Sequence, residues 1–224
     1  LPASVILMFT GPVNCLTLKG TKMTLYQSTV GVYLQIIPSI LRCFNKGRKF
    51  CAEKGLDRER FVDARLYDDM LPLHFHIIAL VHFSEGALNA AREGVIGGPD
   101  MTLNFNYDEL ENHLKQALGR LEKLNPDDVN NLAGGEVIFE YNQMILPFST
   151  EDFFRTYASP HFYFRATILY SILRSKGVPL GIADYIGRVK TTPSSRFSAE
   201  VHQHTGDQYL EFLEQLAGPQ VENL

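Results

Sequence analysis

The chain has 224 residues, of which 45% are hydrophobic and 21% charged, with a formal net charge of −4. This composition is typical of a globular domain with a substantial core. The slightly acidic balance gives no support to nucleic-acid binding, which usually leaves a basic surface. No apolar run approaches the roughly 20 residues that span a bilayer, so we expect no membrane partner. Three cysteines without a CxxC pair favour reduced thiols and a cytoplasmic location.

The first predicted helix follows an N-terminal extension. Residues 1–22 contain proline and glycine without a regular apolar period, so we treat them as preceding the domain. Thr24 followed by Gln27 is a capping-box pattern, which predicts that a helix starts there. Apolar residues keep helical spacing as far as Phe44, and Gly55 is suited to end the helix.

Two more amphipathic helices are predicted in the middle of the chain. The second covers about residues 70–92, with Pro72 in its first turn and a glycine-rich segment after it. Asn106 and Glu109 form another capping-box pattern and predict the start of the third. Leucines at helical spacing follow, and Asn125-Pro126 is expected to stop this helix.

The period then changes from helix to strand. The stretch "EVIFEYNQMILPF" at residues 136–148 alternates apolar and polar residues, which predicts a β-hairpin that turns near Asn142. Ser149 is suited to cap a short helix after it. Ser159-Pro160 is typical of a helix start and predicts the last main helix, which Gly177 should end.

These elements predict a mainly α protein, a bundle of four helices with a small β-hairpin before the last one. The division is an extension at 1–22, a bundle domain at 23–187, and a tail at 188–224. The tail combines a polar linker with the amphipathic stretch "DQYLEFLEQLAG". That helix is too short to be stable alone, so we expect it to dock on the body or on a partner.

A family resemblance rests on five stretches of residues 23–187. They read "MTLYQSTVGVYLQIIPSI", "ARLYDDMLPL", "FEYNQMILPFSTEDFF", "SPHFYFRATILYSILRSKGVPLG" and "DYIG". In this order they resemble the helical-bundle family known as domain of unknown function nineteen-ninety-three, which is grouped with the DinB/YfiT-like bundles. The resemblance implies a DinB-like up-and-down four-helix bundle with a pocket between its helices.

The resemblance also bears on metal binding. Many relatives in the wider DinB group bind a divalent metal through three histidines, two of them on a late helix, and some are transferases or hydrolases. The narrower family usually reads close to P-N-F-Y-F-H-A-T on that helix. The present chain reads "PHFYFRAT", which places His161 at the asparagine position and Arg165 at the histidine position.

Three histidines of the second helix suggest a metal site at first sight. On a helix, His74 and His76 point about 200° apart, and His74 and His82 lie about 12 Å apart along the axis. This segment can therefore offer at most one ligand to a common metal, with His161 as the best second ligand. The charged guanidinium of Arg165 would repel a divalent cation. We favour histidines satisfied by hydrogen bonds and no cofactor, and a bound divalent metal is the alternative.

Arg165 and Asp69 each have two interpretations. Arg165 can bind an anionic or carbonyl group of a ligand, or it can form an ion pair with Asp69 or Glu85. Asp69 can complement the start of the second helix, or it can place a carboxylate at a pocket mouth.

The predicted function is the binding or transformation of a small, largely apolar molecule between the helices, without a catalytic metal. One alternative is a non-catalytic interaction protein that forms a homodimer. Another is DinB-like metal-dependent transferase or hydrolase chemistry. The candidate catalytic residues are His161, Arg165 and His82, and the candidate ligand-binding residues are His74, His76, Tyr163, Asp69 and Phe162.

Overall fold

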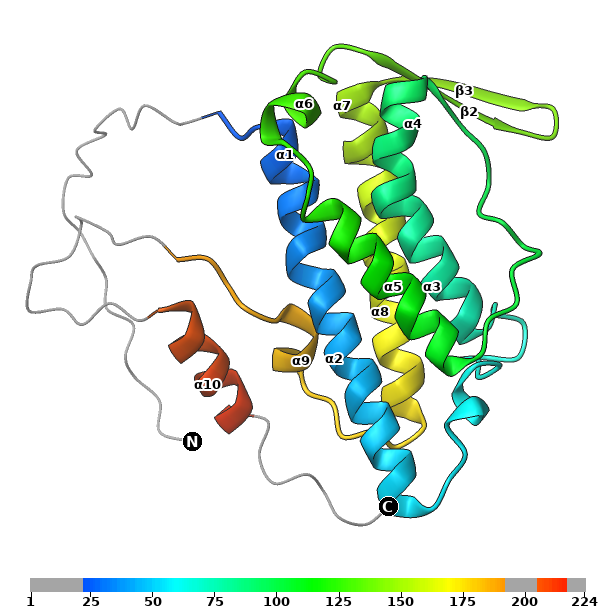
Figure 1. The fold of residues 1–224 in the computed structure, drawn as a ribbon, viewed down its shortest axis with the longest axis vertical. Helices are drawn as coiled ribbons and strands as arrows, with labels where there is room; N and C mark the ends of the chain where they lie inside the picture. The colour runs from blue at the N-terminus through cyan, green and yellow to red at the C-terminus, as the bar shows by residue number, and fades with distance from the viewer. Residues whose placement is uncertain (1–21, 192–204, 217–224) are drawn as a thin grey trace, which may run out of the picture.

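Four helical rods lie side by side in the computed structural model, which describes residues 22–191 and 205–216 (Figure 1). Almost all of the predicted extension, most of the predicted linker, and Cys15 lie outside these residues. The rods are α1 and α2 (Leu25–Ser28, Val30–Lys54), α3, η2 and α4 (Leu73–Val81, His82–Gly86, Ala87–Glu93), α5 (Tyr107–Leu121), and α7, η3 and α8 (Thr150–Asp152, Phe153–Ala158, Ser159–Ser175).

The predicted caps of the first and third rods are confirmed. Thr24 and Gln27 form the capping box of α1, and the left-handed Gly55 ends α2. Asn106 and Glu109 form the capping box of α5. These local signals fix where each rod begins, because they satisfy backbone N–H groups that a helix leaves free.

The second rod begins three residues later than predicted and contains a π-helical turn. Pro72 is the N-cap of α3 rather than a first-turn residue, because its own backbone is extended, with ψ at 167°. The π turn η2 carries His82, and α4 ends at the left-handed Gly94.

The fourth rod corrects part of one prediction. Ser149 caps α7 and α8 begins at Ser159, as expected, but Ser159 is not a helix cap, because Ala158 before it is also helical. The rod runs continuously from α7 through the π turn η3 into α8. A proline inside an α-helix clashes with the carbonyl four residues earlier, and the wider π turn just before Pro160 accommodates the ring.

A three-stranded sheet closes one end of the bundle, and its hairpin projects past the helices (Figure 1). β2 (Glu136–Tyr141) and β3 (Met144–Ser149) form the predicted hairpin, with Asn142 at φ 54° in the turn. The parallel strand β1 (Val95–Ile96) was not predicted. Ile138 pairs with Pro147. Because proline has no N–H, the Pro147 nitrogen faces away from β2.

The core lies between the four rods. α2 packs against α5 and α8, and α3 packs against the same two helices. Tyr107 of α5 is fully buried and donates a hydrogen bond of 2.7 Å to the carbonyl of Phe44 in α2. Cys43 and Cys51 are buried free thiols, as expected. No helix of the described ranges is long and apolar enough to cross a bilayer.

Short elements complete the fold. The 3-10 turn η1 (Arg58–Phe61) follows α2, and the short helix α6 (Pro126–Asn130) begins at the proline that was expected only to stop the third helix. α9 (Ile182–Ile186) packs on α2, and α10 (Gly206–Leu216) packs on α9, so the terminal helix docks on the body.

Candidate functional site

The three histidines of the second rod point to three different places, as their spacing predicts. In each of the three rings, one nitrogen forms a hydrogen bond with a backbone carbonyl. The expectation that these histidines are satisfied by hydrogen bonds is therefore confirmed. The bonds join His74 Nδ1 to Val62 O (3.2 Å), His76 Nε2 to Leu71 O (3.0 Å) and His82 Nε2 to Gly97 O (3.1 Å).

His76 is held as a neutral imidazole. Its side chain is 1% exposed. Because Nε2 donates to a carbonyl, Nδ1 is the free acceptor, and it receives a hydrogen bond of 3.3 Å from Nη1 of Arg165. Burial, and then the charge of Arg165, lower the pKa of His76 to about 4. The ring therefore stays uncharged at neutral pH.

Arg165 contacts two aromatic rings. Its guanidinium carbon is 5.1 Å from the ring centre of Phe75 and 5.4 Å from that of Phe164, which is the geometry of cation–π contacts. The Nε atom is buried without a hydrogen-bond partner among the described residues. Burial lowers the pKa of Arg165.

The predicted ion pairs of Arg165 are wrong. Glu85 of the π turn faces α5 and pairs with Arg120 instead. Asp69 is exposed in the loop before α3, and Pro72 takes the N-cap position, so Asp69 does not cap the helix. The residue that Arg165 contacts is a histidine 89 positions away in the sequence.

His82 and His161 both pack against the ring of one phenylalanine. The His161 ring stacks on Phe83 at 4.4 Å with an interplanar angle of 11°, and the His82 ring lies 4.9 Å from Phe83, edge to face. Tyr157 of η3 packs against His161 at 4.8 Å. Burial lowers the pKa of both histidines. The contact between the π turn η2 and the helix α8 therefore brings three predicted site residues, His82, His161 and Arg165, to one interface.

The described residues do not fit the three-histidine metal site that the resemblance implies. No three His, Cys, Asp or Glu side chains within 22–191 and 205–216 are placed to hold a metal ion. The Nε2 atom of His82 is engaged with a carbonyl, and Arg165 occupies the late-helix position where the family motif has histidine. A permanent cation there opposes a divalent ion.

The other predicted residues lie apart from this interface. Phe162 is a core residue, fully buried with its ring 4.7 Å from Tyr33. Tyr163 is exposed on another face of α8. His74 lies 3.5 Å from the exposed carboxylate of Asp63.

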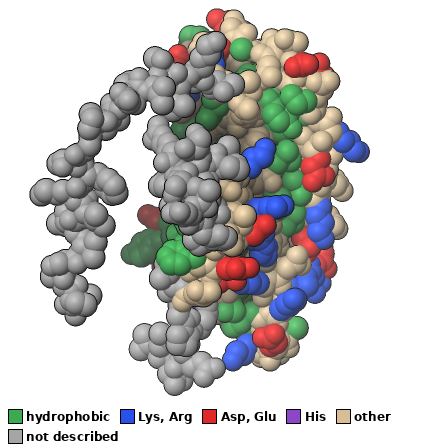
Figure 2. All heavy atoms as spheres, turned by 90° about the vertical axis from the view of Figure 1, so that its left-hand side faces the viewer, with side chains coloured by type: hydrophobic (Ala, Val, Ile, Leu, Met, Phe, Trp, Pro, Cys, Tyr) green, Lys and Arg blue, Asp and Glu red, His purple; other side chains and the backbone are tan. Residues whose placement is uncertain are grey.

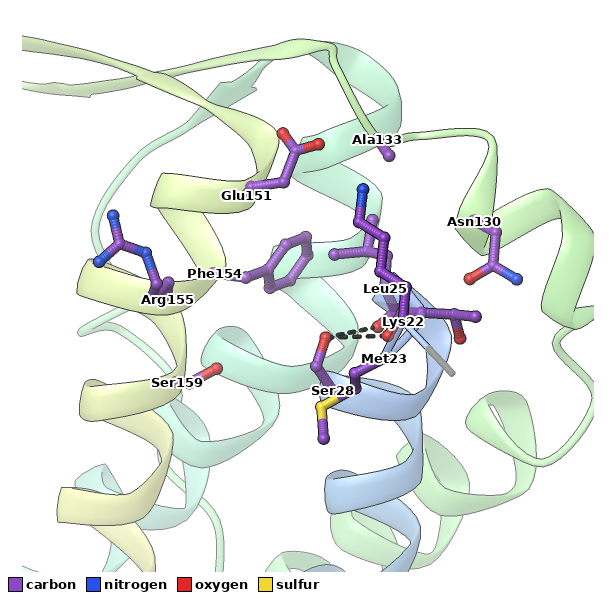
Figure 3. A pocket seen from close by; sticks show the side chains of 11 residues that line it. Lys22, Met23, Leu25, Ser28, Asn130, Ala133, Glu151, Phe154, Arg155 and Ser159 are labelled. Carbon is purple, nitrogen blue, oxygen red and sulfur yellow. Dashed lines mark hydrogen bonds between the residues drawn. The ribbon is translucent and has the colours of Figure 1, made fainter. Parts of the chain in front are cut away.

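A pocket of about 630 Å³ opens at the end of the bundle where α1, α6 and α7 meet (Figure 3). None of the eight predicted site residues lines it. Its walls mix apolar and polar side chains, with three charged residues among them. The lining residues are Lys22, Met23, Thr24, Leu25, Ser28, Asn130, Ala133, Glu151, Phe154, Arg155 and Ser159.

Hydrogen bonds between side chains and backbone groups hold this pocket together. Asn130 of α6 accepts a hydrogen bond of 2.9 Å from the backbone N–H of Tyr26 in α1. The Ser28 hydroxyl bonds back to carbonyls of its own helix. Glu151 accepts from the N–H of Gly134, which fixes the loop above the pocket. Sequence periodicity missed these residues, because long-range contacts assemble them.

The surface charge is mixed on the face that carries α1, α2 and α9. Basic and acidic side chains alternate over the visible part of this face and do not gather into one basic patch (Figure 2).

The fold shows the class of protein to which the chain belongs. The chain is a DinB-like helical bundle, since it is similar to a solved structure described as a DinB family member protein from Shewanella denitrificans. The similarity has a TM-score of 0.62 and 21% identity, and it covers 76% of this chain and 96% of that one. At this identity the likeness shows the fold alone.

The family follows from the sequence. A family model described as "Domain of unknown function (DUF1993)" matches residues 25–186, and the chain belongs to this family. The resemblance and the fold class predicted from the sequence are confirmed. No curated protein matches the chain.

Proposed function

We propose that this protein binds a small, largely apolar molecule in the pocket at the end of the bundle. One observation carries the proposal, a pocket of about 630 Å³ between helices whose walls combine apolar surface with polar side chains. Pockets of this size and character are typical ligand sites. The sequence analysis predicted the same kind of ligand, but it expected this ligand beside the histidines and Arg165 and not in this pocket.

The ligand we propose is neutral, with a hydrogen-bonding group on an apolar body. Phe154 and Leu25 supply apolar surface, and Ser159 and the Asn130 amide supply hydrogen-bonding groups near them (Figure 3). Arg155 is already paired with Asp152, so its charge is compensated. Burial of the apolar body provides the driving force, at about 25 cal/mol per Å².

Catalysis is not part of this proposal. Ser159 lines the pocket, whereas His161 is two positions later and points about 200° away on the same helix. The catalytic roles of His161, Arg165 and His82, the homodimer and the cytoplasmic location stay predictions.

The test is an NMR titration of isotope-labelled protein with indole and 1-naphthol as neutral apolar probes. We expect chemical-shift changes at Leu25, Ser28 and Phe154. Ala133→Trp should block binding because Ala133 lies at the pocket mouth, and Ala52→Trp, at an exposed position of α2, is the matched control. Equal binding to both variants, or shifts confined to other regions, would contradict the proposal.

A further inference from the structure

Arg165 differs from the other arginines of the described residues. Five of them pair with carboxylates: Arg48, Arg58, Arg120, Arg155 and Arg188. Five more have no carboxylate partner and are exposed: Arg42, Arg60, Arg65, Arg92 and Arg174. Arg165 alone is partly buried without a carboxylate within reach, and its Nε atom has no partner. A partly desolvated charge without a counter-charge is costly for a fold.

We propose that Arg165 anchors a second binding site, at the α3–α8 interface, for the carboxylate of a small organic molecule. The guanidinium is planar and its donors form a fork that matches a carboxylate. The rings of Phe75 and Phe164 border the guanidinium at 5.1 and 5.4 Å from its central carbon. Phe164 is 51% exposed and Arg165 is only partly buried, so solvent reaches this part of the interface.

His76 acts as a positioning residue in this site. Its Nδ1 atom binds Nη1 of Arg165, and its Nε2 atom is anchored on the carbonyl of Leu71. This chain of two hydrogen bonds fixes one end of the guanidinium. Nη2 makes no hydrogen bond to the described residues and is available to the ligand, whereas Nε is covered by the protein.

The charge of the interface favours a carboxylate over a phosphate. The groups that face Arg165 are the rings of His76, Tyr157 and His161, and burial keeps both histidines neutral near pH 7. The site therefore carries a single positive charge. A carboxylate neutralises this charge, whereas a phosphate dianion would be left with an excess charge in a largely aromatic environment.

The test uses phenylacetate, its neutral analogue phenylacetamide, and inorganic phosphate, each titrated into labelled full-length protein. The readout is the Nε–H NMR signal of Arg165 together with the dissociation constant. We expect phenylacetate to shift this signal and to bind at least about tenfold more tightly than phenylacetamide or phosphate.

Variants then separate charge from geometry. Arg165→Gln should weaken phenylacetate binding about tenfold or more. The affinity of Arg165→Lys for phenylacetate should lie between those of the unaltered protein and Arg165→Gln, because lysine keeps the charge but loses the planar fork. Arg174→Gln, an exposed arginine of the same helix, should bind like the unaltered protein. If Arg165→Gln does not fold, the proposal is tested by the affinity of Arg165→Lys and by the Nε–H signal of Arg165 in the unaltered protein.

Three results would overturn the proposal: equal binding of phenylacetamide, unchanged phenylacetate binding by Arg165→Gln, or no shift of the Arg165 signal at saturating phenylacetate. Tighter binding of phosphate would reassign the site to a different anion and equally reject the carboxylate. The pocket at the bundle end uses different residues, so either proposal can fail while the other stands.

Discussion

Lowering the pH should destabilise the protein, because His76 is buried as a neutral imidazole inside the bundle. The pKa of His76 is lowered to about 4 from an ordinary value of 6.5, because the ring is buried and faces Arg165. Between these two values the unfolded chain binds a proton more readily than the folded protein does. Stability is therefore intact above pH 6.5 and falls as the pH is lowered toward 4.

The size of the effect follows from the same shift. The proton linkage of a single group with these two pKa values amounts to about 2 kcal/mol lost between pH 7 and pH 5. His76→Gln should abolish this loss and keep the packing. The glutamine amide can donate to the Leu71 carbonyl and its oxygen can accept from Arg165, which reproduces both bonds of the neutral ring.

Urea unfolding at pH 7 and pH 5 measures the effect in both proteins. We expect the unaltered protein to lose about 2 kcal/mol more than His76→Gln on acidification. Other buried histidines contribute to the loss in both proteins and cancel in the comparison. Equal losses would refute the view that His76 is the neutral, buried partner of Arg165.

Two further predictions concern close packing. Tyr107→Phe should cost about 1 kcal/mol through its lost hydrogen bond. Gly47→Ala should destabilise the protein when made alone, since the new Cβ would lie 2.9 Å from the Tyr107 hydroxyl. In the Tyr107→Phe background, which lacks this hydroxyl, the same substitution should stabilise the protein. A double-mutant cycle by urea unfolding measures this change of sign in the effect of Gly47→Ala, and additive effects would contradict it. Gly187→Ala should destabilise the docking of α9, because its φ is +63° and the Cβ would lie 2.1 Å from Ser39 Oγ. Hydrogen exchange of α9 amides measures this, and Gly119→Ala, with open space around it, should leave exchange in α9 unchanged.

Local signals made most of the fold predictable from the sequence. The capping boxes at Thr24 and Asn106 depend on residues three positions apart, and the hairpin depends on alternation and on Asn142 in its turn. The π turn before Ser159-Pro160 could not be predicted in this way. α8 begins at Ser159, as the pair indicates, but the π turn η3 joins it to α7 in one continuous rod, and no sequence period indicates such a turn.

The candidate sites were harder to predict, because tertiary contacts decide them. Helical geometry showed that His74, His76 and His82 diverge, and this was confirmed. Charge suggested a carboxylate for Arg165, yet its partner is the uncharged ring of His76, 89 residues away. The pocket at the bundle end draws on segments separated by more than a hundred residues, such as Ser28 and Asn130.

The outward nitrogen of Pro147 limits how this protein can associate with other chains. β3 is the outer strand of the sheet within the described residues, and its Met144, Ile145 and Leu146 side chains are exposed. Such an edge would normally recruit a further strand, but an incoming strand finds no donor at Pro147. The apolar hairpin is thus protected against growth into an extended sheet, and self-association through it would have to use the faces of its strands.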